Sequence, residues 1–179
     1  ILILFLLFSP IFEGELQNSL RDLFPRKILF EFSNEGYEGL DVTRMWIYKN
    51  AFELIKENPF FGIGAGSFTE IFFLNTNFWK GHSHNLFLEL SISYGLPSTI
   101  IFFLTTINIL YSSSKKIFSN KIKIDVPYID RAFWSALFFF LISQLADVQY
   151  FDGKISLITW ILIAGLKNII LDKDYRTEA

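Results

Sequence analysis

The sequence has no cysteine, one methionine and two histidines among its 179 residues. The absence of cysteine excludes disulfides, thiolate metal ligands and cysteine nucleophiles. Two histidines are too few for a histidine-rich metal site, so we expect no metal site of that kind. The net charge of −2 is also small, which argues against nucleic acid or any other strongly charged partner.

Apolar residues, by contrast, make up 51% of the chain and include 22 phenylalanines. They gather into long runs, and a helix needs about 20 apolar residues to cross the ~30 Å core of a bilayer. We predict an all-α, polytopic transmembrane protein with three spans within residues 96–171, at 96–112, 132–148 and 155–171. A soluble helical bundle is disfavoured because these helices lack a polar face.

The chain opens at Ile1 inside an apolar run, without the methionine and basic residues that begin a signal peptide. We interpret residues 1–12 as the second half of a further membrane helix. We therefore expect the natural protein to continue upstream, with part of any site lying there.

The charge of the connecting segments predicts their side of the membrane. Residues 113–128 carry four lysines and one aspartate, whereas residues 13–94 carry seven basic and eleven acidic residues. Basic loops stay in the cytoplasm. We thus place 113–128 and the tail 172–179 inside, and the large loop 13–95 outside.

Two helices are expected within that outer loop. One runs from Asp41, as its cap, to Glu57, where Asn58 and Pro59 stop it; it is amphipathic and either lies on the membrane surface or packs over the spans. The second, over residues 85–94, starts after Ser83 as its cap. It is too short to cross the bilayer, so we expect a re-entrant or interfacial helix.

Three features of the outer loop are candidates for chemistry. Arg44 falls on the apolar face of the first helix. In a structural role it snorkels to water or pairs with an acidic residue. In a functional role it faces a cavity and binds an anion such as phosphate. Residues 58–68 are rich in glycine but lack dinucleotide-binding spacing, which favours a tight turn. His84 stands at a helix start, whose positive end keeps imidazole neutral and available as a base; otherwise it is an ordinary polar residue.

The motifs RMW at 44–46, ENPFFGIGAGSF at 57–68, HSHNLFLE at 82–89 and YGLP at 94–97 together resemble the O-antigen ligase and polymerase family. The family pattern has His, then Asn, Ser or Gln, nine residues, Gly, two residues, and Gly, Thr or Tyr. His84, Asn85 and Gly95 fit this pattern, whereas Ser98 departs at the last place. The resemblance covers residues 44 to about 103.

This resemblance implies a fold of the GT-C type, in a multi-pass protein of the bacterial inner membrane with its site facing the periplasm. It implies an undecaprenyl-diphosphate-linked glycan as donor, an acceptor glycan such as lipid A-core or a growing polysaccharide, and no metal or nucleotide. Arg44 corresponds to an arginine that binds the donor diphosphate, and His84 to the essential histidine. Other family arginines lie in earlier loops that this chain lacks.

The expected reaction is an inverting glycosyl transfer in lipopolysaccharide or polysaccharide biosynthesis, with His84 as base and Arg44 balancing charge on the leaving diphosphate. Further substrate contacts are expected from His82, Asn85, Glu89 and Trp79, although Glu89 is otherwise a surface carboxylate. Trp46, Trp79 and Tyr94 either stack on sugars or anchor the interface. Ligase, repeat-unit polymerase and protein O-glycosyltransferase are not separated by these residues, and the rival class is a non-catalytic scaffold or transporter subunit.

Overall fold

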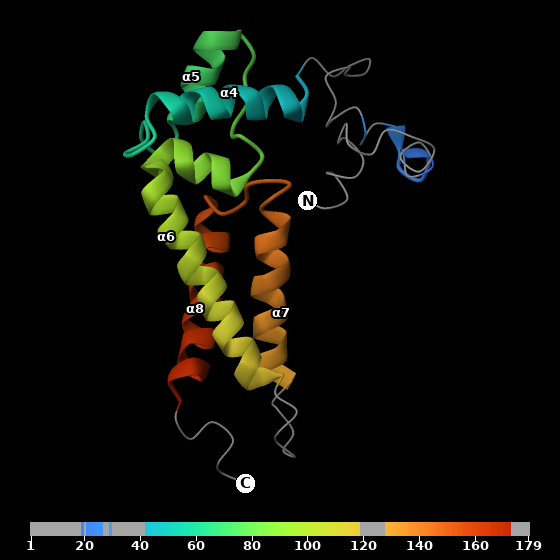
Figure 1. Ribbon diagram of the computed structural model, residues 1–179, viewed down its shortest axis with the longest axis vertical. Coiled ribbons are helices and arrows are strands. Elements are labelled where there is room, and N and C mark those ends of the chain that lie inside the picture. The colour runs from blue at the N-terminus through green and yellow to red at the C-terminus, as the bar shows by residue number, and fades with distance from the viewer. Residues whose placement is uncertain (1–18, 20, 27–28, 30–41, 119–127, 173–179) are drawn as a thin grey trace.

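The computed structural model describes residues 19, 21–26, 29, 42–118 and 128–172. Within these residues the protein is all-helical, as predicted, and contains no strand. Its elements are α4 (Arg44–Glu57), α5 (Ser67–Thr76), α6 (Leu86–Ile117), α7 (Tyr128–Ser143) and α8 (Gly153–Leu171). The helices α6, α7 and α8 run along the long axis, and α4 crosses above their upper end with α5 beyond it (Figure 1). Most of residues 1–41, including the predicted span at 1–12, lies outside the described residues.

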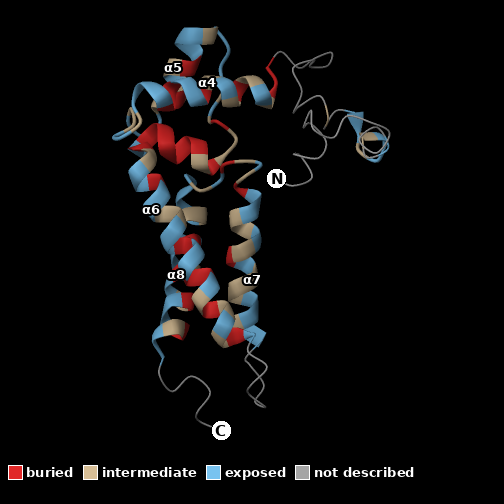
Figure 2. Ribbon diagram, viewed as in Figure 1, coloured by how far each residue is buried: buried red, intermediate tan, exposed pale blue. Residues whose placement is uncertain are grey.

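Two of the described helices are long and apolar enough to cross a membrane. They are α6, with 32 residues and a mean hydropathy of 1.5, and α8, with 19 residues and a mean hydropathy of 1.7. In the lower half of the bundle they pack with α7 around one apolar cluster, visible as the buried positions of Figure 2. Its members are Ile109, Leu110, Ile117, Leu137, Ile163, Leu166 and Ile169.

The helix α7 is shorter than the predicted span, because it ends at Ser143 instead of continuing to residue 148. The Gln144 side chain, which is 1% exposed, turns back and accepts hydrogen bonds from the N–H groups of Gln149 and Tyr150. These bonds satisfy backbone donors that a helix would otherwise have used. Residues 144–152 therefore form a structured loop at the upper end of the bundle.

The amphipathic helix α4 begins at Arg44, with Thr43 as its N-cap, and not at a cap provided by Asp41, which lies outside the described residues. The Thr43 hydroxyl accepts a hydrogen bond from Trp46 N–H. The helix ends at Glu57, as predicted. Its apolar face is buried against α5 and the first part of α6, so α4 packs over the bundle. The cluster contains Ile47, Ala51, Leu54 and Ile55 with Phe68, Phe72, Leu88 and Ile92.

The predicted short helix and the following span form a single element, α6, broken at Gly95 (φ 82°, ψ 163°). The break, together with Pro97, removes the helical donors for the Ile92 and Ser93 carbonyls. The glycine-rich segment supplies replacements: Ile63 N–H donates to Ile92 O at 2.7 Å, and Gly64 N–H to Ser93 O at 3.1 Å. In return, Leu96 N–H donates to Pro59 O at 2.8 Å.

This exchange of hydrogen bonds explains why glycines occur on both sides of the contact. A Cβ atom on Gly62 would lie 2.4 Å from Ile92 O, and one on Gly95 would lie 2.1 Å from Phe60 O. Gly62, Gly64 and Gly66 all have positive φ, which confirms the predicted tight turn. The glycine-rich segment therefore holds the α6 break through backbone hydrogen bonds, and we call this segment the clasp.

We predict that Gly95→Ala destabilises the protein by at least about 2 kcal/mol, since it combines a strained backbone with a clash against backbone atoms that cannot rotate away. Thermal unfolding of the detergent-solubilised protein measures the effect. Gly153→Ala is the matched control, because Gly153 has an ordinary φ and a Cβ added there would meet no atom within 4 Å. Equal unfolding temperatures for the two variants would contradict the proposed role of the clasp.

Candidate active site

Two loops that lie about 60 residues apart in the sequence meet at the upper end of the bundle. Asn85 connects them: its side-chain oxygen caps α6 by accepting from Phe87 and Leu88 N–H, and its amide nitrogen donates to Leu145 O at 3.2 Å. The Leu86 N–H also donates to Gln144 O at 2.9 Å. The start of α6 is thereby fixed against the 144–152 loop.

The N-cap of α6 is thus Asn85. The prediction from the sequence, Ser83, is wrong. Ser83 is buried, and its N–H donates to the carboxylate of Glu89 at 2.8 Å. Glu89 is itself only 4% exposed. A carboxylate is a strong acceptor for such a backbone N–H group. Glu89 therefore holds the histidine loop in shape from inside the protein, and the alternative interpretation of it as a surface carboxylate is wrong.

His84 adopts a left-handed backbone conformation with φ 55°, which is uncommon for a residue with a side chain and is found often at functional sites. Its backbone is held on both sides. The His84 N–H donates to His82 Nδ1 at 3.2 Å, and the Tyr48 hydroxyl donates to His84 O at 3.4 Å. The imidazole is directed toward the 144–152 loop, where Nδ1 lies 3.1 Å from Oδ1 of Asp147.

Asp147 is the central acceptor of this site. Its Oδ1 accepts a hydrogen bond from the N–H group of the next residue, Val148, at 2.9 Å. The same oxygen lies 3.1 Å from His84 Nδ1 and 3.5 Å from His82 Nε2. Burial raises the pKa of this carboxyl, but the hydrogen bonds from Val148 and His84 and the neighbouring histidine charges outweigh it, so the pKa is lowered overall. Asp147 is therefore ionised at neutral pH.

The sequence did not identify Asp147 as a site residue. The available signal was a carboxylate at the outer end of an apolar stretch, where ionisable groups usually have functional roles. Its pairing with His84, 63 residues earlier, depends on how the loops fold together.

The pKa of His84 is lowered from its ordinary value, first by burial and also by the neighbouring charges of His82 and Arg44, against the opposing effect of its hydrogen bond to Asp147. The imidazole is thus neutral at pH 7, as predicted, with burial as the main cause of the lowered pKa. An ionised carboxylate only accepts, so Nδ1 of His84 carries the proton and Nε2 is the basic nitrogen. The side chain is 25% exposed, which leaves it accessible.

Arg44 joins this site from the first turn of α4. Its guanidinium donates to the backbone oxygen of Ala146, one residue before Asp147. It also lowers the pKa values of Tyr48 and His84 by its charge, although burial raises the pKa of Tyr48 overall. The structure therefore brings together the two residues that the sequence assigned to catalysis, which lie 40 positions apart.

The remaining predicted contacts divide into two groups. His82 and Asn85 lie in the loop junction, while Trp79 is 71% exposed on the connection between α5 and α6. Ligand atoms of His82, His84 and Asp147 all lie within 4.8 Å of one another. That spacing is compatible with a divalent cation, so the three residues have to be tested for metal binding as well as for proton transfer.

An apolar groove of about 480 Å³ adjoins the junction. It extends from Tyr48 and Phe52 on α4 to Phe103 on the part of α6 that follows the break. Its polar lining groups already have partners, since the Tyr48 hydroxyl donates to His84 O and the Asn85 side chain accepts from two N–H groups and donates to Leu145 O. The other lining residues are Phe87, Leu88 and Leu145.

We predict that Asp147→Asn lowers the pKa of His84 further, because Asp147 is the group that stabilises the imidazolium. NMR titration of labelled histidine, in a His82→Gln background that leaves His84 as the one histidine of these 179 residues, measures this pKa. An unchanged or raised value would show that the contact between Asp147 and His84 is not made in solution.

The comparison with known proteins adds to this geometry. The family model described as O-Antigen ligase matches residues 1–103, more than half of the chain and a region that includes Arg44, His82 and His84. No curated protein and no solved structure gives a significant match. The chain belongs to the O-antigen ligase family.

Proposed function

We propose that this chain provides the base and a phosphate-binding arginine for transfer of a glycan from undecaprenyl diphosphate to a sugar acceptor. Family membership supports glycosyl transfer of the ligase or polymerase type in general. The observation that favours these particular residues is the meeting of Arg44, His84 and Asp147 at one loop junction.

In the proposed reaction, Nε2 of His84 removes the proton from an acceptor hydroxyl, whose oxygen attacks the anomeric carbon of the donor sugar. The bond between that carbon and the diphosphate oxygen breaks, the lipid diphosphate leaves with the electron pair, and the anomeric centre is inverted. Asp147 accepts the Nδ1–H throughout. It keeps the imidazole in the reactive tautomer and stabilises the imidazolium that forms.

Arg44 has the complementary task. Negative charge grows on the diphosphate as it departs, and a fixed cation near that position lowers the barrier. The hydrogen bond to Ala146 O orients the guanidinium beside His84, so it does not have to reorganise during the reaction. The planar fork of arginine matches phosphate oxygens in a way that lysine does not.

The groove described above suits the lipid part of the donor. It starts at Tyr48, which interacts with Arg44, and ends at Phe103 on the spanning part of α6. An isoprenoid chain placed there would leave no hydroxyl or amide unpaired. We infer that the first isoprene units lie in this groove, with the diphosphate at Arg44.

The site is proposed to face the periplasm in a multi-pass inner-membrane protein. His84 lies near the upper end of α6, and Lys115 and Lys116 lie in its last turn, at the opposite end (Figure 1). Basic residues favour the cytoplasmic side.

We predict that a reporter active only outside the cytoplasm works when fused at Asn75 or Gly153, and fails at Asn120 in the α6–α7 connection. Activity at Asn120 would reverse this orientation.

In the full-length protein we predict that His84→Ala lowers the transfer rate roughly 100- to 10,000-fold, the usual contribution of a general base, whereas His82→Ala lowers it far less. Wild-type activity should decline only as the pH falls below the ordinary histidine pKa of about 6.5, because the pKa of His84 is lowered. Transfer is measured at matched membrane levels. Equal, small losses in both alanine variants would remove the catalytic role of His84.

Two further arms of the same assay separate the alternatives. A chelator should leave the rate unchanged; loss of activity with the chelator, with equal losses in His82→Ala and His84→Ala, would assign these histidines and Asp147 to a metal site. Arg44→Lys should lose most activity while expression is kept, since lysine lacks the bidentate fork. Near-normal activity of Arg44→Lys would make the arginine a structural anchor.

A further inference from the structure

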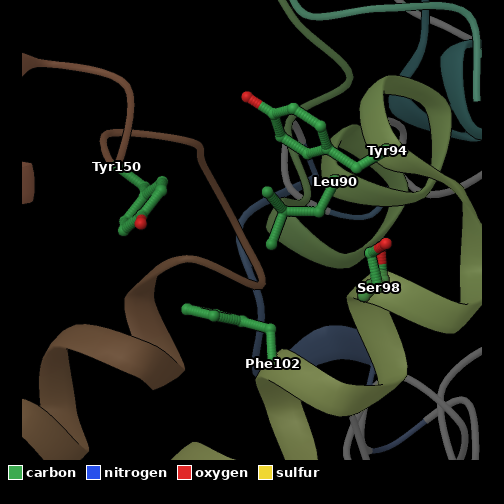
Figure 3. A pocket seen from close by; sticks show the side chains of 6 residues that line it. Leu90, Tyr94, Ser98, Phe102 and Tyr150 are labelled. Carbon is green, nitrogen blue, oxygen red and sulfur yellow. The ribbon is translucent and has the colours of Figure 1, made fainter.

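A second cavity, of about 260 Å³, lies beside the break in α6. Tyr94 and Phe102 extend from the two halves of α6 toward the loop that carries Tyr150 (Figure 3). The cavity shares no lining residue with the apolar groove. We call it the tyrosine pocket; its lining is Leu90, Tyr94, Ser98, Thr99, Phe102 and Tyr150.

The break creates this pocket. Residues 90, 94, 98 and 102 are spaced by four, so an uninterrupted helix would present them as one ridge along a convex face. The non-helical, positive-φ backbone at Gly95 separates the first pair from the second pair and leaves a hollow between them. The Thr99 hydroxyl is already used, because it donates to Gly95 O at 2.9 Å.

Three other hydroxyls of the pocket are chemically different from the lining of the groove. Among the residues that the structure describes, the hydroxyl groups of Tyr94, Ser98 and Tyr150 have no hydrogen-bond partner in the protein. The groove, in contrast, has its polar groups satisfied. A hydrocarbon chain in the tyrosine pocket would cover these hydroxyls without pairing them, which is unfavourable.

We propose that the tyrosine pocket binds one monosaccharide ring of the acceptor glycan, an inference that rests on the proposed function. A pyranose has apolar C–H faces that pack on aromatic rings, and hydroxyl edges that pair with tyrosine and serine hydroxyls. The volume of about 260 Å³ is below the ~300–1,000 Å³ of pockets for drug-sized ligands, which suits a single ring. Tyr150 follows Asp147 by three residues, so their Cα atoms lie within about 11 Å.

Binding is tested without relying on turnover, by saturation-transfer NMR of the methyl glycosides of glucose, galactose and N-acetylglucosamine with the full-length protein in detergent. We expect ring-proton signals for the wild type and at least fivefold weaker signals for Ser98→Trp, which fills the pocket, and for Tyr150→Ala. Tyr128→Ala is the matched control, since Tyr128 is 83% exposed at the far end of the bundle. No signal in the wild type, or equal signals in Ser98→Trp, would overturn the proposal.

The kinetic arm separates the acceptor from the lipid donor. Tyr150→Ala should raise the half-saturating acceptor concentration about tenfold and leave that of the donor unchanged, with a smaller rise for Tyr150→Phe, which keeps the ring. A rise for the donor alone would assign the pocket to lipid and overturn the proposal. If the wild type binds the glycosides in a Ser98→Trp-sensitive manner but transfers no glycan, the proposed reaction fails while the sugar site stands.

Discussion

The interrupted backbone of α6 is the constraint on which the rest of this structure depends. Buried carbonyl groups that lose their helical donors have to find new ones, because unpaired backbone groups are strongly disfavoured away from water. The glycine-rich segment provides those donors to Ile92 and Ser93. This pairing requires two backbones to approach more closely than any side chain permits, and so it requires Gly62 and Gly95.

The consequences of the break extend to the catalytic candidates. The helix α4 packs on the first half of α6, and this packing places Arg44 at the 144–152 loop. The residue that precedes the cap of α6, His84, contacts the same loop. That loop is in turn shaped by the buried Gln144 side chain. Apolar packing and the pairing of backbone polar groups thus bring His84, Asp147 and Arg44 together.

Much of this arrangement follows from the sequence, and the exceptions have identifiable causes. Periodicity and hydropathy predicted the helical class, and the Asn58-Pro59 pair predicted the end of α4 at Glu57. The start of α4, the cap of α6 and the end of α7 were misplaced. In each case several polar residues compete for the same backbone N–H groups, so that Thr43 and Asn85 act as caps and Gln144 closes a loop. Sequence spacing does not reveal which competitor wins.

The residues of the candidate site were likewise predicted only in part. Motif resemblance singled out Arg44 and His84, because both stand in recognisable local sequence. Asp147 has no such context, and its role arises only from a contact across 63 residues. Glu89 belongs to the motif, but the direction of its side chain was not predictable from the sequence. Whether such a carboxylate faces solvent or the preceding loop depends on how the chain turns before the helix. Here the carboxylate accepts from Ser83 N–H in that loop.

The two cavities beside the junction suggest how selectivity is divided between the substrates. An apolar cavity discriminates weakly, by only about 1–3 kcal/mol per methylene, whereas a site with hydroxyls to be paired rejects a ligand that cannot pair them far more strongly. The groove, whose polar groups are already bonded, would accept any chain of suitable width. The tyrosine pocket, with the hydroxyls of Tyr94, Ser98 and Tyr150 at its surface, would distinguish sugars by the placement of their hydroxyl groups. In the proposed scheme a generic lipid carrier is thus held by shape, and the acceptor is chosen by hydrogen bonding.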